Sequence, residues 1–212
     1  MPFLRGETMN HGYFQKLLSC LLCCSLLAGC TPASPVSQEG DSHREALYRA
    51  LAMRNQEHET GSSVLHPAEG FSPREKKDTT LMVYMIGSNL ESQFGNGTRD
   101  LEEMRKAQVD FGKNNVIVYT GGACRWSGRI PSGQNSLLDL SLPEENQIAA
   151  STEKNADMGV SETLAAFLNF TVENFPAQHY DLIFWDHGGG PILGYGSDEL
   201  FGNDSLDLPE LV

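Results

Sequence analysis

An apolar run that stops at a histidine and three consecutive glycines limits what this chain can fold into. The segment reads Asp181-Leu-Ile-Phe-Trp-Asp-His-Gly-Gly-Gly190, so His187 directly follows a strand-like stretch. In parallel α/β sheets, ligands bind in the crevice beyond the carboxyl ends of the strands, and glycines there let a ligand approach the backbone closely. The segment therefore predicts a strand whose end presents an imidazole to a binding crevice.

Two further apolar runs predict strands. Thr79–Ile86 is a continuous apolar run of the kind found in a parallel sheet covered on both faces, and the turn Gly87-Ser-Asn follows it. Asn115–Thr120 is the second predicted strand, and Tyr180–Trp185, which leads to His187, is the third. Helical patterns separate the three strands. This order favours right-handed crossovers and an α/β fold, in which a parallel sheet carries helices on both faces.

The two helical patterns have predicted starts and buried faces. Thr98 is the predicted N-cap of the first helix, and Ser161 is that of the second, which ends before Pro176. The first helix is expected to face the sheet with Leu101, Met104 and Ala107. The apolar face of the second is expected to hold Val160, Leu164, Phe167, Leu168, Val172 and Phe175.

The stretch between Ala123 and Met158 has a different residue pattern, without long apolar runs or helical periodicity. Trp126, the alternating segment Ser136–Leu142 and the turn that begins at Pro143 are typical of hairpins. We expect these hairpin-like excursions to lie outside the main sheet.

Residues 1–29 are predicted to be a cleaved secretory signal. Their apolar run, Leu17–Leu27, is shorter than the roughly 20 residues that a membrane-spanning helix needs, and an uncleaved apolar helix is the alternative. Leu27-Ala-Gly-Cys30 resembles a bacterial lipobox, which implies that lipid is attached to Cys30 and that the mature protein begins there. We therefore expect secretion across the bacterial inner membrane and anchoring to a membrane through lipidated Cys30.

Residues 30–78 are predicted to be a tether, and residues 79–212 the folded domain. The tether is polar and punctuated by prolines, with one short amphipathic helix expected in Arg44–Arg54. Removal of the signal would leave only Cys30, capped by lipid, and Cys124, so no internal disulfide is expected.

The charge of the chain is strongly acidic. Its formal net charge is -13, which repels nucleic acid and suits basic partners, although a solvated acidic surface is the simpler interpretation. No cofactor is required by any motif, and no histidine has metal-ligand spacing, so no metal site is predicted. A solvated loop is the preferred interpretation of the acidic tail, and calcium binding is its alternative. The tail contains Asp198, Glu199, Asp204, Asp207 and Glu210.

Several of these motifs together resemble the clostripain (C11) cysteine peptidases, which belong to a clan with a caspase-like fold. The resemblance covers roughly Thr79 to the end of the chain. It is carried by the glycine and polar turn after the first strand, the helix with Asp100–Met104, Gly121-Gly122-Ala123 with Trp126, and Glu162 through Gly190. It implies a three-layer, caspase-like domain that acts on protein or peptide substrates.

The resemblance also implies roles for single residues. His187 matches the catalytic histidine, which assists a cysteine thiolate and protonates the leaving amine. Gly188 matches the residue whose backbone amide helps to bind the oxyanion, a task that needs no side chain. Asp186 and Gly189 are given supporting roles, since alternation along the strand turns the Asp186 side chain away from that of His187.

The chain departs from the family pattern at the nucleophile. In the family, the reactive cysteine lies in an Asp-Ala-Cys sequence downstream of the histidine, and this chain contains none. We therefore expect a domain that is incomplete at its C-terminus and inactive alone, with the missing C-terminal part as its partner. The complete enzyme is expected to cut after arginine or lysine. Cys124 is not expected to replace the nucleophile, although a pair with His187 is geometrically conceivable.

Two alternative functions stay open. His-Gly-Gly-Gly after an apolar strand also resembles the oxyanion loop of α/β-hydrolase esterases, a fold that needs a Gly-x-Ser-x-Gly sequence not found here. The second alternative is a surface lipoprotein without catalytic activity. The complete reading frame would distinguish the three functions.

Overall fold

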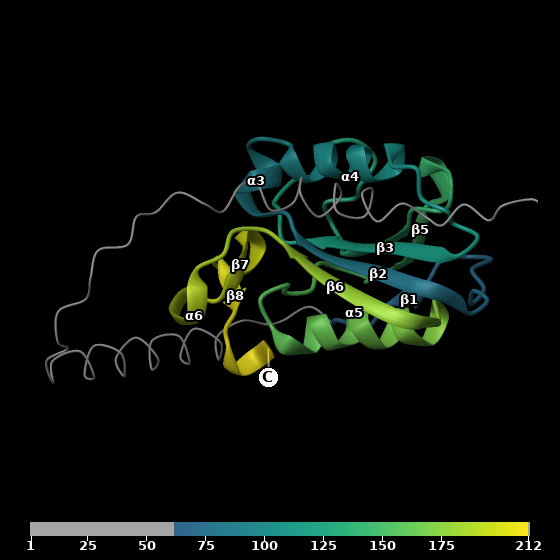
Figure 1. The fold of residues 1–212 in the computed structure, drawn as a ribbon. Helices are drawn as coiled ribbons and strands as arrows, with labels where there is room; N and C mark the ends of the chain where they lie inside the picture. The colour runs from purple at the N-terminus through teal and green to yellow at the C-terminus, as the bar shows by residue number, and fades with distance from the viewer. Residues whose placement is uncertain (1–61, 212) are drawn as a thin grey trace, which may run out of the picture. The chain divides into compact units, whose positions relative to one another are not determined.

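The computed structural model describes residues 62–211, which build a six-stranded sheet in the order β1-β5-β4-β3-β2-β6 (Figure 1). Three neighbouring strands are parallel: β3 (Asn114–Gly121), β2 (Lys77–Ile86) and β6 (Ala177–Trp185). Helices α3 (Ser88–Ser92) and α4 (Asn96–Lys106) cover one face and α5 (Ser161–Asn174) covers the other. The predicted α/β architecture is confirmed, and each predicted strand lies within the observed one.

The other half of the sheet is antiparallel. Strand β4 (Ser136–Asp139) pairs with β3, and β5 (Ile148–Ser151) pairs with β4. The prediction that this hairpin lies outside the main sheet is wrong. All four residues of β4 are buried, with Leu137 and Leu138 in the core, so the alternating pattern belongs to a strand covered on both faces.

The folded region begins before Thr79. Strand β1 (His66–Pro67) pairs with β5. The centroid of the Phe71 ring lies 5.9 Å from that of the Phe170 ring. Arg74 Nη2 lies 2.7 Å from the Asp139 carboxylate. The last part of the predicted tether therefore packs on the domain. The predicted signal, Cys30 and the predicted helix in Arg44–Arg54 lie outside the described residues.

Two helices cover the face above β2. Helix α3 (Ser88–Ser92) follows β2 directly, and α4 (Asn96–Lys106) follows α3. Leu101 and Met104 are buried, as predicted. Thr98 is not the N-cap, because α4 begins two residues earlier. Instead, the buried Glu91 carboxylate of α3 accepts hydrogen bonds from the backbone nitrogen and hydroxyl of Thr98 at 2.8 and 2.7 Å.

Helix α5 (Ser161–Asn174) covers the opposite face. Its Phe167 ring stacks on Tyr119 of β3, with 5.2 Å between the ring centroids. The prediction that Val172 belongs to the buried face is wrong, since this side chain is 46% exposed and Thr171 is buried in its place. Thr171 continues the spacing of seven and four residues set by Leu164 and Phe167, whereas Val172 is turned about 100° further around the helix.

The acidic tail is folded, which corrects the expectation of a solvated loop. After β6 come the short helix α6 (Gly190–Leu193), strands β7 (Tyr195–Asp198) and β8 (Asp204–Leu206), with η2 (Glu199–Phe201) between them, and η3 (Pro209–Leu211). The β7–β8 hairpin and η3 appear in yellow in Figure 1. Asp198 and Asp204 are buried. The Asp198 carboxylate accepts hydrogen bonds from the backbone nitrogens of Met158 and Leu200, which satisfies its oxygens inside the protein.

Three buried aspartates meet where this hairpin packs against residues 156–159. Burial, together with the nearby carboxyls of Asp198 and Asp204, raises the pKa of Asp157 to about 7. Burial also raises the pKa of Asp198 to about 6. The folded chain thus holds a proton on Asp157 at a pH where the unfolded chain, with an aspartate pKa of about 3.9, has released it. The resulting stability is complete below about pH 4 and is lost as the pH rises through about 7.

Asp157→Asn should therefore reduce the loss of stability with rising pH. The amide oxygen can still accept the hydrogen bond that Asp157 Oδ1 accepts from Gly159, and it never becomes charged. The midpoint of thermal unfolding, measured between about pH 5 and pH 8, should fall less in this variant than in the unmodified chain. Asp110→Asn is the matched control, because Asp110 Oδ1 accepts a bond from Gly112 in the same local geometry but is exposed. An equal fall in Asp157→Asn and the unmodified chain would contradict this prediction.

Candidate active site

The candidate site lies beyond the carboxyl ends of the three parallel strands. His187 follows β6, Ser88 and Asn89 follow β2, and Cys124 follows β3. Because Met85 of β2 is paired with Trp185 of β6, the two strands end at the same edge of the sheet. This is where α/β folds bind their ligands.

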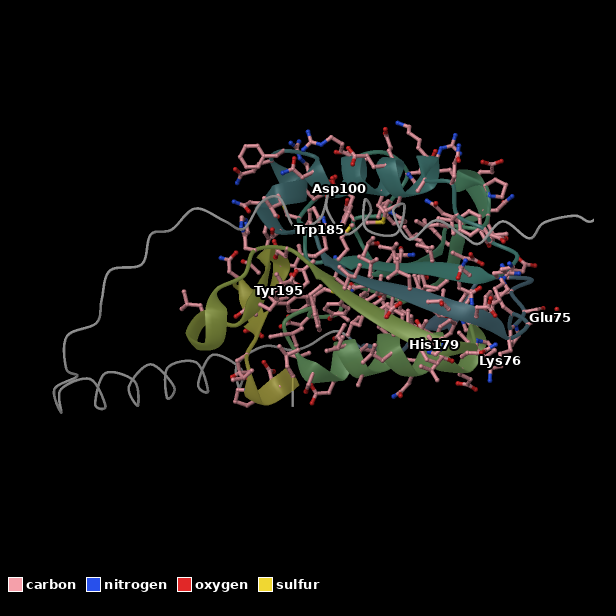
Figure 2. All side chains as sticks on the ribbon, viewed as in Figure 1. Glu75, Lys76, Asp100, His179, Trp185 and Tyr195 are labelled. Atoms are coloured by element: carbon pink, nitrogen blue, oxygen red, sulfur yellow. The ribbon has the colours of Figure 1, made fainter. Side chains whose placement is uncertain are left out.

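The end of β6 is also tied to helix α4. The indole nitrogen of Trp185 donates a hydrogen bond of 2.8 Å to the Asp100 carboxylate, and both residues are labelled in Figure 2. The rings of Phe184 and Tyr195 meet edge to face, with 5.1 Å between their centroids. The strand end that carries His187 is therefore held by contacts on both of its faces.

The His187 side chain is exposed and is held by a helix residue. Its Nε2 atom lies 2.8 Å from Asn89 Oδ1. Asn89 belongs to α3, which begins where β2 ends, so the parallel pairing of β2 and β6 brings the two side chains together. The ring is accessible to a reacting group and yet has a fixed partner.

Asp186 has partners of its own. Ser88 Oγ donates to Asp186 Oδ1 at 2.6 Å, and the backbone nitrogen of Ser197 donates to Oδ2 at 2.7 Å. Burial raises the pKa of Asp186 to about 6, although both hydrogen bonds and the nearby His187 favour the charged form. These contacts suit the supporting role predicted for Asp186, which stays a prediction.

An isolated antiparallel β-bridge joins the glycine segment after His187 to β7. Gly188 lies opposite Tyr195, and the flanking hydrogen bonds run from Gly196 N to His187 O and from Gly189 N to Gly194 O. In this antiparallel pattern the central residue points its own N–H away from the neighbouring strand. A Cβ atom on Gly188 would meet nothing within 4 Å, so the space beside it is open.

The outward amide of Gly188 can therefore donate to a ligand. That of Gly189 is already used within the protein, by the Gly194 carbonyl at 2.9 Å. The two backbone amides therefore differ: that of Gly188 is available to a substrate, and that of Gly189 closes the turn. Both assigned roles stay predictions.

Cys124 is bound to a different group from His187. It is exposed, and its backbone nitrogen donates to Glu199 Oε2 at 2.9 Å. Burial alone would raise the pKa of Glu199, but hydrogen bonds from the Cys124 backbone and side chain and from Ser92 hold it below its usual value. Strand β2 lies between the strands that carry Cys124 and His187. The described contacts thus direct the thiol to Glu199 and the imidazole to Asn89.

Sequence reasoning missed four residues that shape this site. The sequence predicts Ser88 and Asn89 only as a turn and Glu199 only as part of a solvated tail, and it gives Ser197 no role. The turn did carry a usable signal, since polar residues at the end of one parallel strand lie beside the end of its neighbour. Nothing in the sequence pairs Ser197 with Asp186, because this contact depends on how the tail folds back.

No metal or membrane-spanning element is found in the described part of the chain. Among residues 62–211, no three His, Cys, Asp or Glu side chains are grouped as metal ligands, and the tail carboxylates of Asp198 and Glu199 bind backbone amides instead. No helix among the same residues is both long enough and apolar enough to cross a bilayer.

Comparison with known proteins identifies a peptidase family for this chain. The sequence matches the model of the clostripain family over residues 83–211, more than half of the chain. It is 24% identical to clostripain of Hathewaya histolytica over 174 residues, which cover 74% of this chain and 29% of that protein. The chain thus spans less than a third of the length of this curated relative.

Two solved structures are similar at the same level of identity. One is a B. fragilis cysteine protease, 24% identical, with a TM-score of 0.40, where the match covers 53% of this chain and 91% of the other. The second is a secreted C11 cysteine protease from Bacteroides thetaiotaomicron in complex with an irreversible peptide inhibitor. It is 24% identical, with a TM-score of 0.47, and the match covers 63% of this chain and 37% of the other.

The family match runs from the middle of β2 to the last short helix, and so includes every strand end that forms the candidate site. It favours a peptidase over the α/β-hydrolase alternative. The chain belongs to the clostripain family of cysteine peptidases.

Proposed function

We propose that this chain supplies the histidine and an oxyanion donor of a cysteine endopeptidase site. The observation that carries the proposal is the position of His187. Its ring is exposed at the carboxyl end of β6, is held by Asn89, and is followed at once by the outward amide of Gly188. A thiol protease needs a proton carrier beside an oxyanion donor, and these two groups adjoin here.

In the proposed mechanism, a cysteine thiolate attacks the carbonyl carbon of the scissile peptide bond, and the carbonyl oxygen becomes an oxyanion. The Gly188 N–H donates a hydrogen bond to that oxygen. Protonated His187 then gives its proton to the leaving amine, and a thioester remains on the cysteine. Water attacks the thioester with His187 as the base, which releases the carboxylate product and restores the thiol.

The nucleophile is proposed to come from a segment that pairs with the outer edge of β6. Five consecutive residues of this strand, 178–182, are exposed, and the large side chains of Tyr180 and Leu182 are 37% and 36% exposed. Val172 of α5 adds a further exposed apolar side chain. An edge strand with unpaired backbone groups and exposed apolar side chains is a template for another strand. This supports the proposal that a C-terminal part of the same domain is the partner.

The proposed substrates are peptides or proteins cut after arginine or lysine. The resemblance to the clostripain family suggests this preference, and the formal net charge of -13 supports it, because an acidic surface attracts basic substrates.

The 212-residue chain is expected not to hydrolyse fluorogenic arginyl or lysyl peptides. A chain extended through the codons that follow Val212 in its gene should hydrolyse them, because it would supply the thiolate. In the extended chain, His187→Ala should lower kcat/KM about 10²- to 10⁴-fold, the usual contribution of a general acid and base. Cys124→Ala is the matched control and should leave kcat/KM unchanged.

The opposite result would overturn the proposal. If the 212-residue chain turned over these peptides and Cys124→Ala abolished the turnover, Cys124 would be the nucleophile. If His187→Ala in an active extended chain had no effect, the assigned proton carrier would be wrong.

Cys124 is proposed to have no nucleophilic role because its contacts lead away from His187. The Glu199 carboxylate accepts hydrogen bonds from both the backbone and the side chain of Cys124. Strand β2 lies between the strands that carry Cys124 and His187.

The protein is further proposed to be secreted and anchored to a membrane by lipid on Cys30. The sequence Leu27-Ala-Gly-Cys30 supports this, since it resembles a lipobox. Two or more acyl chains give stable anchoring because each buried methylene contributes about 0.8 kcal/mol.

Cys30→Ser should move the protein from the detergent phase to the aqueous phase when bacterial cells that express it are partitioned with Triton X-114. The cause is the loss of the acyl chains, which the intact mass should also show. Cys124→Ser is the control and should leave the protein in the detergent phase. Aqueous partition of the unmodified chain would contradict the anchor.

A further inference from the structure

We propose that Asn89 is a positioning residue for His187, which selects the ring tautomer that carries the proton on Nε2. The Asn89 amide oxygen accepts that proton in a hydrogen bond, so Nδ1 is left as the basic atom that faces the reacting thiol. The functional meaning of this tautomer rests on the proposed role of His187 as proton carrier. The contact itself is present in the 212-residue chain, at 2.8 Å between Nε2 and Oδ1.

The position of Asn89 follows from the sheet. Strand β2 pairs with β6 up to Met85 and Trp185, and the chain turns directly from β2 into α3. Asn89 is the second residue of that helix, so it stands at the strand end that carries His187. No flexible loop separates the amide from the strand that positions it.

The turn that carries Asn89 is held at several points. The Gly87 nitrogen donates to the Gly121 carbonyl of β3 at 2.8 Å, and the Glu91 nitrogen donates to the Gly87 carbonyl at 2.8 Å. Ser88 has a φ of 45°, in the left-handed region that a serine rarely adopts. Such backbone conformations persist where the surrounding structure enforces them, and they cluster at functional sites.

The two residues of the turn have separate targets. Ser88 Oγ donates to the Asp186 carboxylate at 2.6 Å, while Asn89 binds His187. Consecutive residues of α3 thus hold consecutive residues of the strand end. The bond to Asp186 keeps the turn beside β6, and the bond to His187 sets the ring orientation.

The chemistry of the partners decides which ring nitrogen is basic. A neutral imidazole has one N–H donor and one lone-pair acceptor, and the hydrogen bond at one nitrogen sets the role of the other. An amide oxygen is an acceptor only, so it favours the proton on Nε2. Because the amide is neutral, it orients the ring without the charge that a carboxylate would bring close to a thiolate.

Nitrogen-15 NMR of the 212-residue chain tests this assignment directly, at a pH where the imidazole is neutral. Ring nitrogen shifts report the tautomer, and loss of the signals in His187→Gln identifies them. The His187 ring should carry its proton on Nε2 to a greater extent than His179, an exposed histidine of β6 that serves as the internal reference. A hydrogen bond of ordinary net strength, about 1 kcal/mol, corresponds to a roughly fivefold larger tautomer ratio.

Three variants separate positioning from general structure. Asn89→Ala should return the tautomer ratio of His187 to that of His179, a roughly fivefold change. Asn89→Asp should retain the excess of the Nε2 proton, because a carboxylate oxygen is also an acceptor only. Gln93→Ala, which removes an exposed amide just past the end of α3, should change nothing.

Two results would overturn the proposal. One is an Nδ1-protonated ring in the unmodified chain, which would mean that the Asn89 amide nitrogen donates to Nε2. The other is a ratio equal to that of His179 in the unmodified chain, a measurement that needs no variant to fold.

The outcome is independent of peptidase activity. If the tautomer is as expected but the extended chain does not cut peptides, the proposed function fails and the positioning stands. If the extended chain cuts peptides but the tautomer is not held, only the positioning fails. In an active extended chain, Asn89→Ala should lower kcat and leave KM unchanged, because the proposed effect of Asn89 acts through the His187 ring.

Discussion

The parallel pairing of β2 with β6 is the constraint on which the candidate site depends. The carboxyl ends of both strands lie side by side, so the residues that follow β2 are next to the residues that follow β6. Helix α3 begins immediately after β2, and its first two residues reach Asp186 and His187. A shift of this register by one residue would turn the side chains to the opposite faces and separate every one of these contacts.

The C-terminal hairpin supports the same site from the other side. Ser197 of β7 donates to Asp186, and Glu199 holds the loop that carries Cys124. The hairpin is itself held by Asp198, which binds the backbone of Met158. Its attachment therefore depends on buried carboxyls, whose ionisation is unfavourable away from water. The support of the site and the pH dependence of folding consequently share one structural element.

The strands of the parallel half could be predicted because each is a continuous apolar run, and burial on both faces requires such runs. The prediction for β4 and β5 was wrong because a short segment of alternating apolar and polar residues has the same pattern in a surface hairpin and in a buried strand of the main sheet. The start of α4 was misjudged for another reason. Its N-cap is Gly95, and the carboxylate that binds its first turn is that of Glu91, seven residues before Thr98 in another helix. A contact between two helices leaves no local pattern in the sequence from which it could be predicted.

The sequence by itself determined the α/β class, the order of the parallel strands along the chain and the place of His187 at a strand end, because periodicity and apolar runs are local properties. The resemblance of its motifs also predicted the clostripain family, which comparison confirmed. Only the tertiary structure decided which groups hold that histidine and its neighbours. The partners Asn89, Ser88 and Ser197 lie 98, 98 and 11 residues from the groups that they bind. Such contacts depend on strand order and on how the tail folds back, and these properties emerge only when the sheet assembles.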